Sequence, residues 1–528
     1  MFERPEIDPD AAPDFTDAAG CAKWLQALPL INVAAAHERV LAQIEQLNGF
    51  EIAPAERLKI LELLRGPVDF VQKEHSKKFS GRPAPLAKPE REIFHDVVAL
   101  WEALSSGYQH CLYAAAGGAF APSAPLVGQR MLWCTGQKMI ARYQAYQDVR
   151  EHDWRLLHAV YAFAEERGAT AKDVPHPARK GRQTSCSETY VQVLLLHLGN
   201  PSKLTSRQIG LISLWLERWA NKVPLASSAP AGEDVAPLVV DLASAEGAAR
   251  RAAEGAKIRF LDVQEVGKNL RKRFGLLRKG ETPASLGLGE DVTTPLAQSM
   301  LTLLYRRWCE EGQPRAHPRR SASGTAQIGA GMPAIYYFVT GSAFRSVGGS
   351  RAMSQTQHEE IATFGRLATR RDDDTGTTPN FVPETWTIRD ESPSGLRLDR
   401  IDPSARSRLT LGQLLGIRPA DAKAYLLCTT RWLSVTEDFG LSIGVQILPG
   451  VPLGIAIRAA EAEAEQYTAA LMLPAIAALK TPETLVLPAG WFKPQRVIEV
   501  RAEGSRQVRL ATLVDRGVDF ERVAFEAT

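Results

Sequence analysis

The stretch that decides the fold, residues 385–449, begins TWTIRDESPSGLRL (385–398). It continues with strand-like runs at 409–418 and 425–435, and it ends with LSIGVQIL (441–448) before a Pro-Gly pair. Glycine, proline, aspartate and serine separate these short β-rich runs. Short strands between such turn residues are typical of a small antiparallel barrel, so we predict a β-barrel in this part of the chain.

One turn in this stretch carries the pattern D-x-S-x-x-G, formed by Asp390, Ser392 and Gly395. An R-x-x-x-R pattern lies upstream of it, and the closing run 441–448 is similar to a late barrel strand. With these features, residues 315–458 resemble the PilZ domain family. The resemblance implies a receptor for cyclic di-GMP that binds its ligand through both motifs, with no other cofactor, no metal and no catalytic residue.

Two arginine pairs match the upstream motif. The second pair is closer to Asp390, as is usual in the family, but it lies in a segment with helical character. The first pair comes directly before an apolar run at 326–338, where the family places the first barrel strand. We therefore expect the binding arginines to be the first set, with the second as the alternative: Arg315, Arg319 and Arg320, or Arg366 and Arg370.

These residue types suit the implied ligand. A guanidinium group can bind the O6 and N7 acceptors of guanine or a phosphate with two hydrogen bonds, and it can stack on a base. A carboxylate accepts the N–H donors of the guanine edge, and glycine permits a close backbone approach. Aspartate and serine also form local turns without any ligand, so the D-x-S-x-x-G pattern alone has a purely structural interpretation.

Length, charge and hydrophobic content indicate the number of domains, the classes of partner and the location to expect. The chain has 528 residues, a formal net charge of +3 and 45% hydrophobic residues, which is ordinary for a protein of two to four globular domains. Because the charges nearly balance, no global field attracts nucleic acid or an anionic membrane. No apolar run is long enough to span a membrane, the N-terminus does not resemble a signal peptide, and the six cysteines are scattered. We expect a cytoplasmic protein.

Apolar residues at helical spacing dominate the chain before the barrel. They predict a bundle or hairpin array of helices as an interaction domain at 16–311, after a flexible arm at 1–15. An isolated strand is expected at 238–242. The fold class is thus a multidomain α plus β protein, with a helical N-terminal part and a PilZ-like antiparallel barrel.

The expected barrel domain covers residues 312–460 and includes a polar insertion at 341–380. A further segment at 461–528 completes the chain. An alanine- and glutamate-rich run at 457–472 favours a helix, and four strands should follow. These strands, which either extend the barrel or form a second β unit, are expected at 484–488, 496–502, 506–514 and 519–526.

Other candidate sites have simpler structural interpretations. Ser185, Cys186 and Ser187 precede an apolar helix, where serine is an ordinary cap. His358 lacks a second histidine at a metal-binding spacing, and we interpret Trp432 and the other tryptophans as core residues. The basic helix near 263–277 is interpreted as a solvated face, because no aromatic residues or nucleic-acid motif accompany its lysines and arginines.

Three functional hypotheses remain open. The first is a non-catalytic cyclic di-GMP effector whose helical domain contacts an unidentified protein partner in motility, attachment or secretion. The second is an interaction scaffold with a degenerate barrel that binds no nucleotide. The third is an enzyme with an unrecognised site, which the absence of P-loop, nucleophile-elbow and zinc-protease motifs disfavours.

Overall fold

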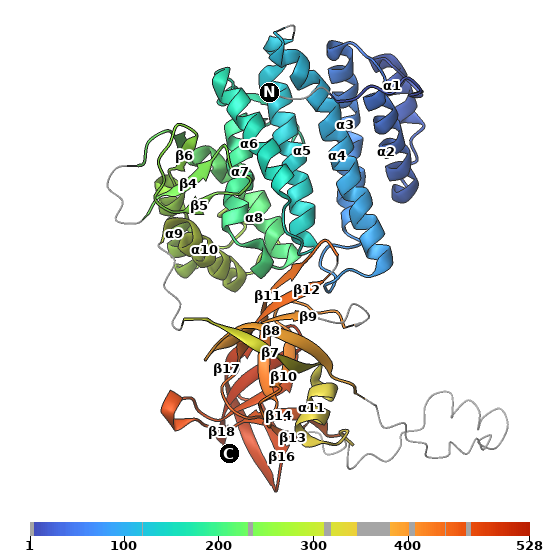
Figure 1. Cartoon of the computed structure of the whole chain (residues 1–528). Helices are drawn as coiled ribbons and strands as arrows, with labels where there is room; N and C mark the ends of the chain where they lie inside the picture. The colour runs from blue at the N-terminus through green and yellow to red at the C-terminus, as the bar shows by residue number, and fades with distance from the viewer. Residues whose placement is uncertain are drawn as a thin grey trace, which may run out of the picture. The chain divides into compact units, whose positions relative to one another are not determined.

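The computed structural model describes residues 5–118, 120–230, 236–310, 318–345, 381–400, 407–438, 440–460 and 466–528. The chain divides into two compact units, Met1–Pro314 and Arg315–Thr528. The first is largely helical and the second is largely β (Figure 1). The multidomain α plus β class predicted from the sequence is confirmed.

Ten α-helices lie among the described residues of the first unit. They are α1 (Ala18–Gln26), α2 (Val33–Gly49), α3 (Pro54–Ser76), α4 (Lys88–Ala116), α5 (Ala124–Gln144), α6 (Glu151–Glu166), α7 (Cys186–Leu198), α8 (Ser206–Trp219), α9 (Gln264–Arg278) and α10 (Thr294–Cys309). Capping side chains fix several starts: Asp17 and Ser185 each accept a hydrogen bond from the backbone of the first turn.

Helices adjacent in the sequence lie side by side, which gives the predicted array of hairpins (Figure 1). Their apolar faces form one continuous core, and large aromatic side chains such as Phe94, Tyr108, Trp215 and Trp308 are fully buried in it. Two of these rings also donate hydrogen bonds through their indole nitrogens. Trp215 donates to the Leu288 carbonyl, and Trp308 donates to the Leu195 carbonyl.

Two expectations for this unit are wrong. The expected isolated strand is β4 (Leu238–Asp241), which lies inside a sheet of order β3-β6-β4-β5. The expected loose arm packs against the helices: Phe15 is buried, and the Asp8 N–H donates to the Gly49 carbonyl at 2.9 Å. The remaining short strands of the unit are β1 (Val174–Pro175), β2 (Gln183–Thr184), β3 (Leu225–Ala226), β5 (Ala249–Arg250) and β6 (Ile258–Leu261).

The second unit begins with the predicted barrel, which is antiparallel and closed, in the order β10-β11-β12-β9-β8-β7. Alternate residues such as Trp386, Ile388, Leu398 and Ile443 point inward and are buried. Its strands are β7 (Arg320–Ala330), β8 (Glu384–Ser392), β9 (Gly395–Arg400), β10 (Leu414–Pro419), β11 (Leu426–Val435) and β12 (Leu441–Ile447).

The first barrel strand is shorter than expected, because the predicted strand at 326–338 contains a helix. Strand β7 ends at Ala330, and α11 (Met332–Thr340) follows. Gly331 and Gly341 have φ angles of 85° and 76°, a conformation that glycine adopts without strain, and Gly341 ends the helix.

The last part of the chain forms a second closed antiparallel barrel, in the order β13-β14-β15-β18-β17-β16. The helix expected at 457–472 is wrong, because this region supplies the first two strands. The four strands expected after it are present. The six strands are β13 (Leu453–Ala459), β14 (Thr468–Leu473), β15 (Thr484–Pro488), β16 (Val497–Arg501), β17 (Ser505–Arg516) and β18 (Phe520–Ala527).

The two barrels share a core, in which α11 packs against strands of both. Ile335 of α11 is fully buried with Leu414 of the first barrel and with Leu471 and Phe520 of the second. The Asp519 carboxylate also accepts a hydrogen bond from the Leu414 N–H at 2.9 Å. The barrels therefore form one packed unit.

Candidate functional site

The D-x-S-x-x-G motif forms the hairpin between β8 and β9. Asp390 and Ser392 lie at the end of β8, Pro393 and Ser394 make the turn, and Gly395 begins β9. The Ser392 hydroxyl donates to the Gly395 carbonyl at 3.2 Å, which closes the turn. A β-bulge between Ile388 and Asp390 sets the direction of the motif side chains.

Gly395 is required by close packing within the barrel. A Cβ atom at this position would lie 2.3 Å from the Val445 carbonyl oxygen of β12, and Gly395 does not have a positive φ angle. The structure therefore gives this motif residue a role in strand packing.

Arg319 lies immediately before β7 and forms an ion pair with Asp390. The two side chains are 25% and 23% exposed, so the pair is partly shielded but can still be reached by a ligand. The structure thus brings together one predicted arginine and the predicted aspartate across 71 residues of sequence.

The other predicted arginines are placed differently. Arg320 is exposed and pairs in register with Glu391, so it belongs to the face of the ladder opposite to that of Asp390. Arg315, Arg366 and Arg370 lie outside the described residues. Which arginine pair binds a ligand therefore stays a prediction.

Two residues that the sequence did not single out as binding residues, Arg397 and Trp432, lie on the same face of the barrel as Asp390. Arg397 is the register partner of both Asp390 and Gly444, and Gly444 is paired with Trp432. A row of side chains therefore runs from Asp390 across β9 and β12 to Trp432. Arg397 faces outward, because its neighbours Leu396 and Leu398 are buried in the barrel.

Trp432 belongs to this outward row, so its interpretation as a core residue is wrong. Its indole ring lies across Gly444, where a Cβ atom would be 1.7 Å from the indole nitrogen. The Arg397 guanidinium lies 5.8 Å from the centre of the ring. No motif signals this arrangement, because it depends on which strands are paired.

A second row of side chains lies beside the first and contains the ion-paired carboxylate of Asp399. Asp399 accepts hydrogen bonds from Arg389 at 2.7 Å and from Ser442 at 2.5 Å. Burial raises the pKa of Asp399, but these hydrogen bonds and the charges of Arg389 and Arg397 outweigh it, so that the pKa is lowered. Asp399 is therefore ionised at neutral pH and holds Arg389 along the barrel surface.

The outward face thus combines a flat aromatic ring, a guanidinium beside it and a carboxylate paired with a second guanidinium. Aromatic rings and guanidinium planes stack on nucleobases, and arginine binds phosphate with charge-assisted hydrogen bonds. A carboxylate accepts the N–H donors of a guanine edge. These groups have the chemistry that binding of a nucleotide would require.

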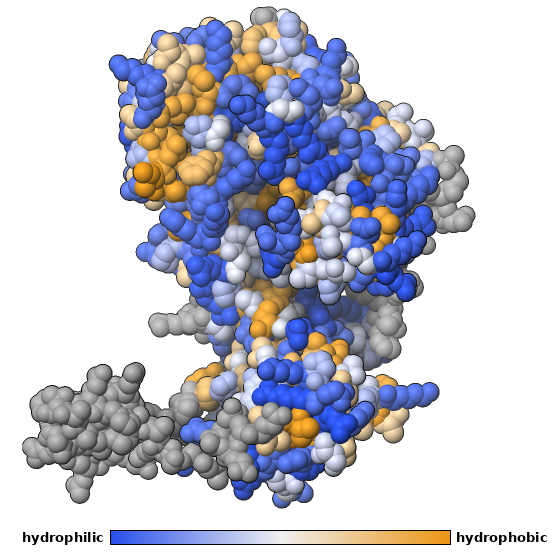
Figure 2. Space-filling view, turned by 180° about the vertical axis from the view of Figure 1, so that it is seen from behind, coloured by the Kyte–Doolittle hydropathy of each residue, from blue (hydrophilic) through white to orange (hydrophobic). Residues whose placement is uncertain are grey.

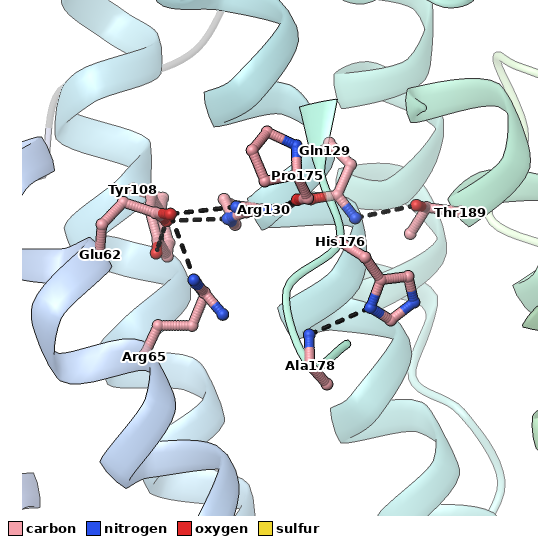
Figure 3. A network of polar contacts seen from close by, with 9 residues as sticks. All are labelled: Glu62, Arg65, Tyr108, Gln129, Arg130, Pro175, His176, Ala178 and Thr189. Atoms are coloured by element: carbon pink, nitrogen blue, oxygen red, sulfur yellow. Dashed lines mark hydrogen bonds and ion pairs between the residues drawn. The ribbon is translucent and has the colours of Figure 1, made fainter. Parts of the chain in front are cut away.

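A second polar cluster lies inside the helical unit (Figure 3). Arg130 is fully buried and binds Glu62 with two hydrogen bonds of 2.8 and 3.0 Å, and Tyr108 donates to the same carboxylate at 2.8 Å. Burial raises the pKa of Glu62, but Arg130 outweighs it and the pKa is lowered. Arg130 also donates to the Pro175 carbonyl, so the cluster joins α3, α4 and α5 to β1.

The candidate nucleophile is structural, as the sequence suggested. Ser185 caps α7, and the Cys186 thiol is buried against the Pro125 carbonyl. Burial raises the pKa of Cys186 to about 12, which disfavours the reactive thiolate. His358 lies outside the described residues, and the described residues contain no cluster suited to hold a metal ion.

Apolar side chains are also exposed on the helical unit. Leu30 and Ile31 precede α2, and Leu63 and Phe70 lie on α3. Figure 2 shows apolar surface on the side of this unit that carries the first helices, at the upper left of that view. None of the described helices meets the length and hydropathy that a membrane span requires.

Comparison with known proteins adds sequence relationships to this geometry. Residues 18–231 match the family described as the N-terminal domain of the cyclic-di-GMP receptor FimW, and residues 454–528 match the FimW C-terminal β-barrel domain. The chain is 23% identical over 531 residues to the cyclic-di-GMP receptor FimW of Pseudomonas aeruginosa, an alignment that covers 92% of this chain and 86% of that protein.

Proposed function

Because residues 18–231 match the FimW N-terminal domain family and residues 454–528 match the FimW C-terminal β-barrel family, we propose that the chain is a receptor for cyclic di-GMP. The alignment with the receptor of that name extends over nearly the whole chain. The first barrel, which lies between the two matched regions, contains the proposed site.

The observation that carries the proposal is the row of side chains from Asp390 to Trp432 on the outward face of this barrel. It brings the D-x-S-x-x-G motif, an upstream arginine and a stacking surface onto adjacent strands. A turn with a purely structural role would not need the two outward residues Arg397 and Trp432 beside it.

Each group has a role in this proposal. Trp432 and Arg397 stack on a guanine base, and the Asp390 carboxylate accepts N–H donors from a guanine edge. Arg319 binds a phosphate or the O6 and N7 acceptors of guanine. Gly395 and Gly444 keep the backbone close enough for the strands and the indole ring to take these positions.

One observation favours the alternative of a scaffold that binds no nucleotide. Asp390 is already paired with Arg319, and Ser392 already donates to the Gly395 carbonyl. The motif residues therefore have partners inside the chain. Under the receptor proposal, the ligand must compete with the Arg319–Asp390 ion pair or bind around it.

Isothermal titration of the full chain with cyclic di-GMP tests the proposal. We expect saturable binding that the Asp390→Ala variant loses, with guanosine triphosphate as a nucleotide control that binds more weakly. No heat of binding at high micromolar cyclic di-GMP would remove the receptor function and leave the scaffold.

The proposal includes signalling without catalysis. The helical unit would pass the nucleotide state to a protein partner, for which the exposed apolar side chains of α3 supply contact surface. Because cyclic di-GMP is a second messenger inside bacterial cells, the proposal implies that the protein is cytoplasmic.

A further inference from the structure

A groove of about 280 Å³ runs between α9 and α10, at the end of the helical unit. Its floor contains the buried side chains of Leu270 and Leu301 and the half-buried ring of Phe274. Gly275 leaves the floor open, because a Cβ atom there would have nothing within 4 Å. The groove is therefore apolar, and it lies outside the region matched by the N-terminal domain family.

Cationic side chains form the walls of this groove. Arg271 and Arg278 line it and are exposed, and the Arg271 guanidinium lies 5.3 Å from the centre of the Tyr305 ring on the opposite helix. Neither arginine forms an ion pair with any residue that the structure describes. The one acidic residue of α9, Glu265, lies in its first turn and faces Lys222 at 3.8 Å.

This geometry changes the interpretation of the basic helix. A solvated basic face has no reason to enclose an apolar groove, and nucleic acid would be held by phosphate contacts that need no leucine and phenylalanine floor. A groove between two helices accepts an amphipathic helix, whose apolar residues at i, i+4 and i+7 fill the floor. Carboxylates beside those residues would meet the two arginines.

We propose that the α9–α10 groove binds an acidic amphipathic helix of a partner protein. The apolar face of that helix lies on Leu270, Phe274 and Leu301, and its aspartate or glutamate side chains pair with Arg271 and Arg278. The inference rests on the proposed function only in naming the kind of partner that the receptor would address. Binding of the helix itself does not require the nucleotide.

The probe is a phage-displayed library of amphipathic peptides about 15 residues long, with apolar residues fixed at helical spacing and all other positions random. Selection on the full chain should enrich peptides rich in aspartate and glutamate. Synthetic copies of the enriched peptides are then measured by fluorescence anisotropy, with lysine-substituted copies as controls.

Two kinds of variant test where these peptides bind. Gly275→Leu fills the floor without changing charge, and leucine favours the helix over glycine, so the fold is kept. Arg271→Glu and Arg278→Glu reverse the charge of the groove walls. Each should weaken the acidic peptides about tenfold or more, whereas Lys272→Glu, an equal charge change outside the groove, should alter affinity less than about threefold.

Several outcomes overturn the inference. The first is enrichment of neutral or basic peptides, and the second is that Gly275→Leu weakens none of the enriched peptides. The third is that the chain binds a single-stranded oligonucleotide, and that Arg271→Glu abolishes this binding whereas Gly275→Leu does not. Titration of the same variants with cyclic di-GMP separates this result from the receptor proposal. The groove variants should keep the wild-type nucleotide affinity, and a chain that binds peptide but no nucleotide would refute only the receptor.

Discussion

At the scale of single residues, Arg319 decides between the two arginine pairs that the sequence offers. Arg319→Ala should weaken cyclic di-GMP binding at least about tenfold, because a lost charge-assisted contact costs roughly 1.5–3 kcal/mol. Arg370→Ala should change the affinity little. Isothermal titration of both variants checks this, and the reverse pattern would move the site to Arg366 and Arg370.

Trp432 can be tested through the glycine beneath it. Gly444→Ala places a methyl group 1.7 Å from the present position of the indole nitrogen, so the ring must move away from the barrel. We expect both Gly444→Ala and Trp432→Ala to cost roughly 1–3 kcal/mol of binding, the usual value of one stacked base. Trp432→Phe should keep most of the affinity.

Tryptophan fluorescence measures whether the ligand contacts the Trp432 ring, with Trp432→Phe as the control. Wild-type emission should fall as cyclic di-GMP is added, and the fall should be largely absent in Trp432→Phe even though that variant binds. Equal quenching in the two proteins would show that the ligand does not contact this ring.

At the scale of elements, the helices of the first unit could be predicted because periodicity and caps agree with the packing. Two stretches of the second unit could not. The run PAIYYFV (333–339) is rich in residues that favour strands, but it is helical between Gly331 and Gly341, where it fills the space between two barrels. The alanine-rich run at 457–472 favours a helix, but β13 and β14 pair there, because tertiary pairing outweighs local preference.

The candidate site shows the same division. Asp390, Ser392 and Gly395 were recognisable because they lie within six consecutive residues of one hairpin. Arg397 and Trp432 were not, because they meet only through the pairing of β9 and β11 with β12. Register is a property of the closed barrel and leaves no local mark in the sequence.

The ion pair between fully buried Arg130 and partly buried Glu62 joins α3 to α5, and removal of one partner should cause a large loss of stability. Glu62→Ala leaves the fully buried Arg130 without its carboxylate, which should cost roughly 3–5 kcal/mol of unfolding free energy. Arg65→Ala removes only an i, i+3 contact to Glu62 and should cost less than about 1 kcal/mol. Denaturant unfolding compares them, and equal losses would contradict the central role of Arg130.

His197 on α7 predicts acid sensitivity of the helical unit. Burial lowers its pKa to about 4 from 6.5, so its contribution is complete above pH 6.5 and is lost as the pH falls toward 4. Between pH 7 and pH 5, the unfolding free energy should drop by up to roughly 2 kcal/mol on its account. His197→Gln should show a smaller drop in denaturant midpoint over this range, and an unchanged drop would assign the sensitivity to other groups.

At the scale of the whole molecule, the shared core makes the first barrel depend on the second. A chain that ends at residue 452 would lose Leu471, Val486 and Phe520, and it would expose Leu414 and Leu427 of the first barrel. We expect such a chain to aggregate or to lose its cooperative thermal transition, although the proposed nucleotide site is complete in sequence. A soluble truncated chain with the wild-type transition would show that the first barrel folds without its neighbour.

Closure of both barrels also limits how other proteins can recognise this one. In a closed barrel every strand has a partner on each side, so no strand offers its full length to an incoming peptide, although the ends of β7, β11 and β17 extend past one partner. The sheet of the helical unit ends in β3 and β5, which are two residues long. Strand addition to these barrels is therefore limited to the short ends that extend past a partner, and neighbouring copies in a crowded cell have no full barrel edge through which to join.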